Sequence, residues 1–484
     1  MKHTRALLLS AVVLSGLSGL SASVGEPQKP NIVFILADDL GWMDTGVYGS
    51  KYYETPNIDR LASQGVRFTN HHNCQNCAPS RAAMMSGQYA PRTGIYTVGS
   101  INRFNWPDRP LRPVDNVTSG LPLDRATIAT QLKAAGYATA MFGKWHLGEN
   151  QGYHPSQRGF DEAVVSDGRH FDFETDPPTA YPKGVYLADW LTDQAVDFIR
   201  RKKDGPLFLY LPHFAVHAPL QAKPELIEKF KPKPAVGHQD NPTYAAMIAS
   251  VDQSVGRIMA LLDELRIADN TVFIFSSDNG GVGLYEFDGT VTAARGVTDN
   301  TPLRGSKAQL YEGGVRDPLI IRWPGVTKPG TLCNEPTIHV DLYPTLLEIA
   351  AAPKPKHVLD GESWVKLLRD PAAALQRDAI FQHFPGYLGA GANQWRSKPV
   401  GTIQCRDWKL MEFFEDGRLE LYNLRNDLGE TNDLAKLMPD KTKELHAKML
   451  AWREAIHAPM PTPNTNDTST VKVRAKKRNR KAAE

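Results

Sequence analysis

Several features that mark specialised protein classes are scarce in this chain of 484 residues. It holds only four cysteines, too few for a fold built on disulfides at this length. Beyond residue 20 no apolar run approaches the ~20 residues that a membrane-spanning helix requires, so we expect no membrane span. Hydrophobic residues make up 41% and charged residues 23% of the chain, as in an ordinary globular protein.

An excess of one charge sign is also missing from most of the chain. The 56 Lys and Arg residues nearly balance the 53 Asp and Glu residues, which gives a net charge of +3. The positive excess lies at the two ends, and the body between them carries about −5. We expect no nucleic-acid partner, because no basic groove interleaved with aromatic residues is present. The basic segment 461–484 is predicted to be a disordered tail.

The N-terminus has the pattern of an export signal. Lys2 and Arg5 precede an apolar stretch, Ala6–Leu20, which is followed by the small residues Ser21–Ser23. This pattern predicts a signal peptide over residues 1–23. The apolar stretch is shorter than the ~20 residues of a membrane anchor. We therefore expect an exported protein, periplasmic or secreted, from a bacterial cell.

The middle of the chain alternates between buried strands and amphipathic helices. The first predicted strand, Asn31–Ala37, is a continuous apolar run rich in β-branched residues, which is typical of a parallel sheet covered on both faces. The alternation predicts an α/β fold with a large, mostly parallel sheet sandwiched by helices over residues 24–375. The predicted strands are Asn31–Ala37, Tyr137–Phe142, Leu207–Leu211 and Thr271–Phe275, and helices are expected over 56–65 and 127–135.

The pattern changes after about residue 375. Thr402–Met411 and Arg418–Leu424 are predicted as short strands, and Thr442–Ile456 has the periodicity of an amphipathic helix. We expect a smaller C-terminal α+β domain over residues 376–460, with a short antiparallel sheet and one helix.

Polar residues follow every predicted strand of the large sheet. Asp38 and Asp39 follow the first strand, and Asp278 and Asn279 follow the last. Ligands of open α/β sheets bind at the carboxyl ends of strands, so these side chains are candidates for one site. Oxygen donors without clustered thiolates favour Ca²⁺ or Mg²⁺ over zinc.

Cys77 begins a run of chemically informative residues that includes Pro79 and Arg81. Proline suits the first helical position, and an anion held there would meet a fixed cation and a nucleophile together. Cys74 and Cys77 also form a CxxC pair, which is typical of a redox pair or of half a zinc site. The run by itself leaves these alternatives open.

Taken together, the motifs resemble the formylglycine-dependent sulfatases of the alkaline phosphatase superfamily. Cys77–Arg81 with Ser86–Gly87 matches the family signature C-x-P-S-R-x-x-x-x-[ST]-G. Further motifs follow in the family's order, and several independent matches make coincidence improbable. These motifs are Gly143–His146, Val216–Pro219, Gly305–Lys307, Asp341–Thr345 and Leu421–Leu424.

The resemblance implies a modified nucleophile and a bound cation. A formylglycine-generating enzyme would oxidise Cys77 to Cα-formylglycine, whose hydrate attacks sulfur. The family's ligand set for Ca²⁺, with Mg²⁺ as the alternative, would consist of Asp38, Asp39, Asp278, Asn279 and modified Cys77.

The resemblance also assigns roles to five further residues. Arg81 and Lys144 would hold and polarise the hydrate, and Lys307 would neutralise sulfate oxygens. His217 would protonate the departing alcohol, and His146 would deprotonate the second hydroxyl to expel sulfate.

The implied activity is a sulfuric ester hydrolase acting on a small-molecule or glycan sulfate ester. Val216–Gln221 looks most like the amino-sugar branch of the family, which favours a sulfated carbohydrate. Ser166 and His213 are weaker candidates for substrate contacts. Two alternatives remain: a formylglycine-dependent phosphodiesterase or phosphonate monoester hydrolase, and a glycan-binding protein that has lost catalysis.

Overall fold

The computed structural model describes residues 29–465, apart from 105, 150, 284–285, 288–289, 292–295 and 392–393. The predicted signal peptide at 1–23 and nearly all of the predicted basic tail lie outside the described residues.

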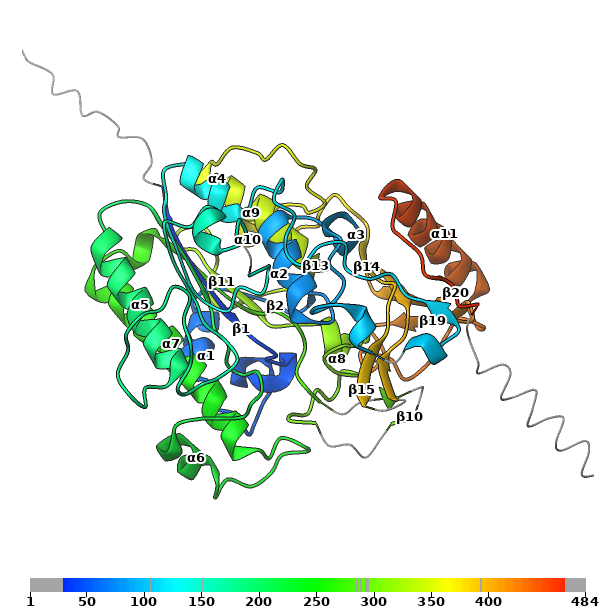
Figure 1. Ribbon diagram of the computed structural model, residues 1–484, viewed down its shortest axis with the longest axis horizontal. Helices are drawn as coiled ribbons and strands as arrows, with labels where there is room; N and C mark the ends of the chain where they lie inside the picture. The colour runs from blue at the N-terminus through cyan, green and yellow to red at the C-terminus, as the bar shows by residue number, and fades with distance from the viewer. Residues whose placement is uncertain are drawn as a thin grey trace, which may run out of the picture.

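An eight-stranded sheet forms the centre of the molecule (Figure 1). The hydrogen-bonded register shows that β11 alone among these strands runs antiparallel to its neighbours. The prediction of a large, mixed, mostly parallel sheet is therefore confirmed. In spatial order the strands are β12 (Thr331–Cys333), β2 (Val66–Phe68), β11 (Leu319–Arg322), β8 (Thr271–Ser277), β1 (Asn31–Ala37), β7 (Leu207–Pro212), β5 (Ala138–Gly143) and β6 (Glu162–Val165).

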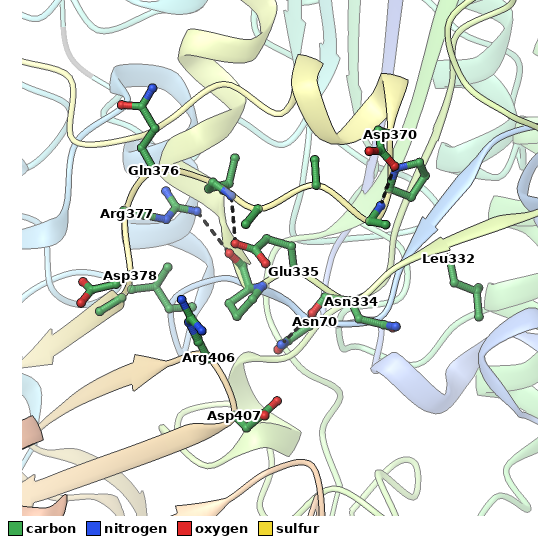
Figure 2. Close-up of a pocket in the computed structure, with 18 of the residues that line it drawn as sticks. Asn70, Leu332, Asn334, Glu335, Asp370, Gln376, Arg377, Asp378, Arg406 and Asp407 are labelled. Carbon is green, nitrogen blue, oxygen red and sulfur yellow. Dashed lines mark hydrogen bonds between the residues drawn. The ribbon is translucent and has the colours of Figure 1, made fainter.

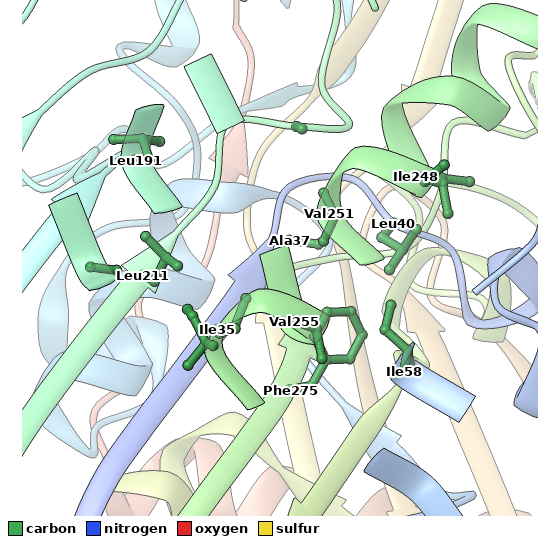
Figure 3. Close-up of a cluster of buried hydrophobic side chains, with 14 of the residues drawn as sticks. Ile35, Ala37, Leu40, Ile58, Leu191, Leu211, Ile248, Val251, Val255 and Phe275 are labelled. Atoms are coloured by element: carbon green, nitrogen blue, oxygen red, sulfur yellow. The ribbon is translucent and has the colours of Figure 1, made fainter. Parts of the chain in front are cut away.

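Helices cover both faces of this sheet, which explains why β1 is apolar from Ile32 to Ala37. Successive side chains of a strand point to opposite faces. Ile35 packs with Ile58 and Val255 of the helices on one face (Figure 3), whereas Phe34 belongs to the core on the other face. The first face carries α1 (Pro56–Ser63), α5 (Leu187–Lys202) and α7 (Pro242–Glu264), and the second carries α2 (Cys77–Ser86), α4 (Ile128–Ala134), α9 (Leu342–Ala350) and α10 (Val365–Arg369).

One helix corrects the expectation that no later segment is apolar enough to span a membrane. Among the described residues, α7 alone meets that test of length and composition. However, 78% of its apolar window is buried inside the protein. Its apolar residues pack against the sheet and the neighbouring helices.

A second, antiparallel sheet of four strands lies towards the C-terminus, with α11 (Pro439–Ala455) packed on one face. The predicted strand Thr402–Met411 is wrong as a single element, because the chain turns back at Arg406 and Asp407. Arg406 adopts φ +54°, a left-handed conformation that glycine usually supplies, so no sequence signal marked this turn. The strands, in spatial order, are β14 (Ile380–Phe384), β17 (Val400–Cys405), β18 (Trp408–Phe413) and β19 (Arg418–Asn423).

The remaining elements are short. They are the helices α3 (Ala90–Thr93), α6 (Pro224–Phe230) and α8 (Glu312–Val315), and the paired strands β3 (His71–His72) with β13 (Thr337–Ile338), β4 (Leu111–Arg112) with β20 (Thr462–Pro463), β9 (Glu286–Phe287) with β10 (Thr290–Val291), and β15 (Leu388–Gly391) with β16 (Gln394–Ser397).

Candidate active site

The register between β1 and β8 brings the predicted ligands together. Ala37 lies opposite Ser277 in this parallel pair, so the residues that follow leave the same edge of the sheet side by side. The side-chain amide of Asn279 donates to Asp39 Oδ1 at 2.9 Å, and the backbone amide of Asp39 donates to Asp278 Oδ1 at 3.3 Å. Two segments 240 positions apart in sequence thus form one cluster of oxygen atoms.

The buried guanidinium of Arg81 forms hydrogen bonds with this cluster. Its guanidinium donates to Asp278 Oδ2 at 2.9 Å, to Asp38 Oδ2 at 3.1 Å and to the Lys144 carbonyl at 2.6 Å. Burial opposes ionisation of Asp38, but Lys144, His217 and Arg81 hold the pKa of that carboxyl well below its ordinary value. Burial and the Asp38 charge raise the pKa of Asp278 to about 6.

Cys77 is the first residue of α2, so Pro79 stands third in the helix and not first as the sequence predicted. Both positions lie in the first turn, where the helix makes no use of the missing amide hydrogen. The Cys77 Sγ lies 3.5 Å from Lys144 Nζ, and burial raises the pKa of the thiol. All four cysteines are free, and Cys74 Sγ instead contacts His339 Nε2 at 3.2 Å. The structure thus contains no CxxC disulfide.

The donor set fits a hard cation. Ligand atoms of Asp38, Asp39 and Cys77 all lie within 4.8 Å of one another. Asp38 Oδ1 and Asn279 Oδ1 are buried and have no hydrogen-bond partner in the protein. Because a buried acceptor without a partner is costly, these oxygen atoms are suited to coordinate a metal ion such as Ca²⁺.

Two lysines converge on the same carboxylates from other loops. Lys144, directly after β5, places Nζ 2.6 Å from Asp38 Oδ2, and Lys307 places Nζ 2.7 Å from Asp39 Oδ1. Burial opposes the charge of Lys144, but Asp38 raises the pKa of this ammonium above its ordinary value, so it stays charged. Both cations point at the carboxylate cluster.

The two predicted catalytic histidines lie on the wall of the same site. His217 Nε2 is 3.7 Å from Asp39 Oδ2, and its Nδ1 lies 2.6 Å from the Ala218 carbonyl. His146 is partly buried, and burial together with Lys144 and Arg81 lowers the pKa of its imidazole well below 6.5. The imidazole of His146 is therefore neutral at pH 7 and can accept a proton.

These side chains line a cavity of about 450 Å³. Cys77, Lys144, His146, His217 and Lys307 all reach its surface. Arg81, by contrast, is fully buried behind the carboxylates, and its contacts orient the side chains of Asp38 and Asp278.

Sequence reasoning missed several residues of this cavity. The centroid of the Phe214 ring lies 5.5 Å from Lys144 Nζ. Arg103, Phe104 and Arg396 also line the cavity, at its rim. No motif marks them, because they come from a bend and hairpin that reach the site only in the folded protein.

The weaker predicted contacts lie elsewhere. His213 is fully buried and places Nε2 3.0 Å from Ser254 Oγ. Ser166 donates to the Glu174 carbonyl at 2.7 Å and lines an adjacent cleft.

Another large cavity, of about 970 Å³, contains none of the predicted site residues. Figure 2 shows that polar side chains surround it, with several of them bonded to one another or to the backbone. Glu335 accepts from the Leu375 amide at 3.0 Å, and Arg377 forms an ion pair with Asp341. We therefore place the active site in the cavity that contains Cys77.

Comparison with known proteins identifies the family. A family model described as Sulfatase matches residues 30–352, which is most of the chain. The chain belongs to the sulfatase family. A second model, described as N-sulphoglucosamine sulphohydrolase, C-terminal, matches residues 306–455.

Curated relatives of this sulfatase agree with that assignment. It is 35% identical to a sulfatase of Formosa agariphila, and the match covers 95% of each chain. It is 33% identical to the N-acetylgalactosamine-6-sulfatase of Homo sapiens, over 71% of this chain and 66% of the relative. The protein is thus a sulfuric ester hydrolase.

Solved structures show the same alkaline phosphatase-like fold. Ps i-CgsB superposes with a TM-score of 0.74 at 28% identity, covering 91% of this chain and 94% of the other. That neighbour has also been solved in complex with k-i-k-neocarrahexaose. The predicted fold class is confirmed.

Proposed function

We propose that this sulfatase removes sulfate from a sulfated carbohydrate outside the cytoplasm, with Cys77 matured to Cα-formylglycine and with Ca²⁺ bound beside it. The observation that carries the proposal is the convergence of Cys77, two carboxylates and two lysines at one cavity. Mg²⁺ is the alternative cation.

The environment of Cys77 makes the unmodified thiol a poor nucleophile, which supports a matured residue at this position. Burial raises the pKa of its thiol, and a protonated thiol is a weak nucleophile at neutral pH. Once hydrated, a formylglycine at this position supplies a hydroxyl nucleophile for attack on sulfur. Lys144 Nζ, 3.5 Å from Sγ, is within reach to stabilise that hydroxyl as it loses its proton.

The cation would be held by Asp38, Asp39, Asp278, Asn279 and matured Cys77. A divalent ion there would supply Lewis-acid polarisation and would neutralise sulfate charge. The orphaned oxygens of Asp38 and Asn279 support this ligand set. Arg81 acts as a positioning residue, because its guanidinium fixes the orientation of two of the carboxylates.

Of the remaining side chains, one binds a sulfate oxygen and two transfer protons. Lys307 reaches the cavity wall and binds a sulfate oxygen as negative charge shifts in the transition state. His217 is partly exposed at the cavity and donates a proton to the departing alcohol oxygen. His146, which is neutral, accepts the proton of the second hydroxyl as sulfate leaves.

A carbohydrate ester is the substrate class that the relatives favour. The chain is about one-third identical to N-acetylgalactosamine-6-sulfatases, and the neighbour Ps i-CgsB has been solved in complex with k-i-k-neocarrahexaose. A cavity of about 450 Å³ accommodates a sugar ring. The N-terminal signal pattern supports export to the periplasm or medium of a bacterium.

Mass spectrometry of the tryptic peptide Phe68–Arg81 tests the maturation. We expect a peptide from a host with the formylglycine-generating enzyme to be lighter than the dithiol form by the difference between CH₂SH and CHO. After alkylation, Cys74 carries the only label and serves as the internal control. Two labelled cysteines from such a host would contradict the proposal.

Turnover provides the second arm of this test. Cys77→Ala is expected to abolish hydrolysis of an aryl sulfate and leave the thermal unfolding transition in place, while Cys74→Ala keeps turnover. Matched sulfate and phosphate esters of one alcohol report the reaction class. A faster phosphate ester would favour the phosphodiesterase or phosphonate monoester alternative.

A further inference from the structure

The rim of the active-site cavity carries cations that the proposed chemistry does not use. Arg103 and Arg396 line it, and we call this pair the cationic rim. The carboxylates Asp38 and Asp39 are already matched by Lys144 and Lys307. Among the residues that line the described cavity, Asp167 is the one carboxylate.

Arg103 is held in a built position at this rim. It ends the short 3-10 helix Ile101–Arg103, whose Ile101 side chain is buried. The Asp115 carboxylate accepts from the Ile101 amide at 2.8 Å and from the Asn102 side chain at 3.1 Å. Asp115 thereby fixes the backbone that presents Arg103.

The Arg103 guanidinium itself remains available to a ligand. It lies 4.7 Å from the centroid of the Phe104 ring, and within the described part of the chain no carboxylate forms an ion pair with it. Phe104 packs closely against the backbone of Gly389 in β15, so the rim joins the large domain to the C-terminal region. A planar cation supported by a ring is suited to bind oxyanions in a bidentate manner.

The cleft next to this cavity has the reverse charge. A cleft of about 890 Å³ shares Val98, His146 and Asp167 with the active-site cavity. No lysine or arginine lines this cleft in the part of the chain that the structure describes. Its carboxylates are Asp115, Glu149, Asp167, Glu174 and Asp176, accompanied by hydroxyls such as those of Thr97 and Ser100.

We infer that the substrate is charged asymmetrically around the scissile sulfate: it carries a second anionic group, bound by the cationic rim, and an uncharged sugar portion directed into the acidic cleft. A guanidinium attracts sulfate or carboxylate oxygens, whereas the five carboxylates repel them. The carboxylates of the cleft accept hydrogen bonds from the hydroxyls of a neutral sugar, and the hydroxyls of the cleft both donate and accept them. This inference rests on the proposal that the ester is a carbohydrate sulfate.

Paired substrates test the inference. The probes are N-acetylgalactosamine 6-sulfate, its 4,6-disulfate and a disaccharide of the 6-sulfate with a uronic acid, which separates a second sulfate from a carboxylate. We expect kcat/KM of the wild type to be higher on at least one doubly charged probe. Arg103→Gln should lower kcat/KM on that probe by about 10- to 100-fold, at least tenfold more than on the monosulfate.

Two further variants separate charge from structure. Arg103→Lys keeps the charge and is expected to recover part of the loss, and Arg112→Gln, an exposed arginine on β4, should change neither rate. The salt dependence of kcat/KM on the doubly charged probe should become weaker in Arg103→Gln.

Equal losses on all three probes, or a wild type that prefers the monosulfate, would overturn the inference alone. A wild type that cleaves an aryl sulfate and none of the three sugars would overturn the carbohydrate assignment, and this inference with it.

Discussion

At the scale of single residues, Arg81 shows how a motif can be recognised before its task is clear. The signature marks it as important, and the resemblance assigns it to the formylglycine hydrate. The structure gives all its hydrogen bonds to Asp38, Asp278 and the Lys144 carbonyl. A fully buried guanidinium that bridges two carboxylates offsets their mutual repulsion, and its removal would leave uncompensated charge.

His213 carries a prediction about pH. It is fully buried, and burial lowers the pKa of its imidazole to about 3, from about 6.5 in the unfolded chain. Between these values the unfolded state binds a proton that the folded state excludes, so stability falls as pH decreases from 6.5 towards 3. From pH 7 to pH 5 this residue alone should lower the free energy of unfolding by about 2 kcal/mol.

Urea unfolding of the wild type and His213→Gln at both pH values measures this contribution. The variant is expected to be less stable at pH 7 but to lose less stability on acidification. His238→Gln, at an exposed position, serves as the control and should keep the slope of the wild type. Identical slopes for the wild type and His213→Gln would contradict the assignment.

At the scale of secondary-structure elements, the ends of strands decide where the site residues stand. Gly143 ends β5 with φ +130°, and a Cβ there would lie 2.0 Å from the Pro212 carbonyl oxygen of β7. The next residue, Lys144, donates its amide to that same oxygen at 2.8 Å. The close approach of these two strands therefore positions Lys144.

Gly143→Ala is expected to destabilise the protein by about 2–4 kcal/mol through crowding and backbone strain. Because Lys144 and His146 follow directly, kcat should also fall at least about tenfold. Chemical denaturation and aryl sulfate turnover measure the two effects. Gly136→Ala is the matched control, since it has φ +88° but no neighbour within 4 Å of the added methyl group, and it should keep kcat. An active, stable Gly143→Ala would disprove this account.

At the scale of the whole molecule, a buried ionic cluster joins the two sheets. Lys409 of β18 places Nζ 2.7 Å from Glu312 Oε1 in α8 and 2.8 Å from Glu430 Oε1. Glu430 in turn accepts from the Glu312 amide at 2.7 Å. α8 follows the loop that carries Lys307, so the C-terminal sheet also supports this loop.

Replacing Lys409 by Met should cost about 3–5 kcal/mol, because two buried carboxylates lose their shared cation. Adding Glu430→Gln should recover part of this loss, since one of those charges is then removed. Lys448→Met removes a surface ion pair with Asp378 as the control and should cost less than about 1 kcal/mol. Thermal and urea unfolding measure these differences, and a Lys409→Met variant as stable as the wild type would refute the role of the cluster.

The sequence predicted much of this architecture because local patterns encode it. The apolar run of β1 indicated a doubly covered strand, and the structure contains that strand at the predicted residues. The hairpin turn at Arg406 escaped prediction, because a left-handed arginine leaves no signature in the sequence. Arg103 escaped for a different reason: its significance comes from a cavity assembled from several distant segments.

The sequence by itself determined the family and the α/β fold and predicted most of the candidate site residues, since periodicity and motif spacing are local properties. Only the tertiary structure decided which of them meet. Strand register brought Asp38 beside Asp278. Packing buried Arg81 against the carboxylates and left His217 partly exposed at the cavity. It also placed a cationic rim beside an acidic cleft. The physical reason is that distance and desolvation, which set electrostatic energies, arise only when distant segments pack together.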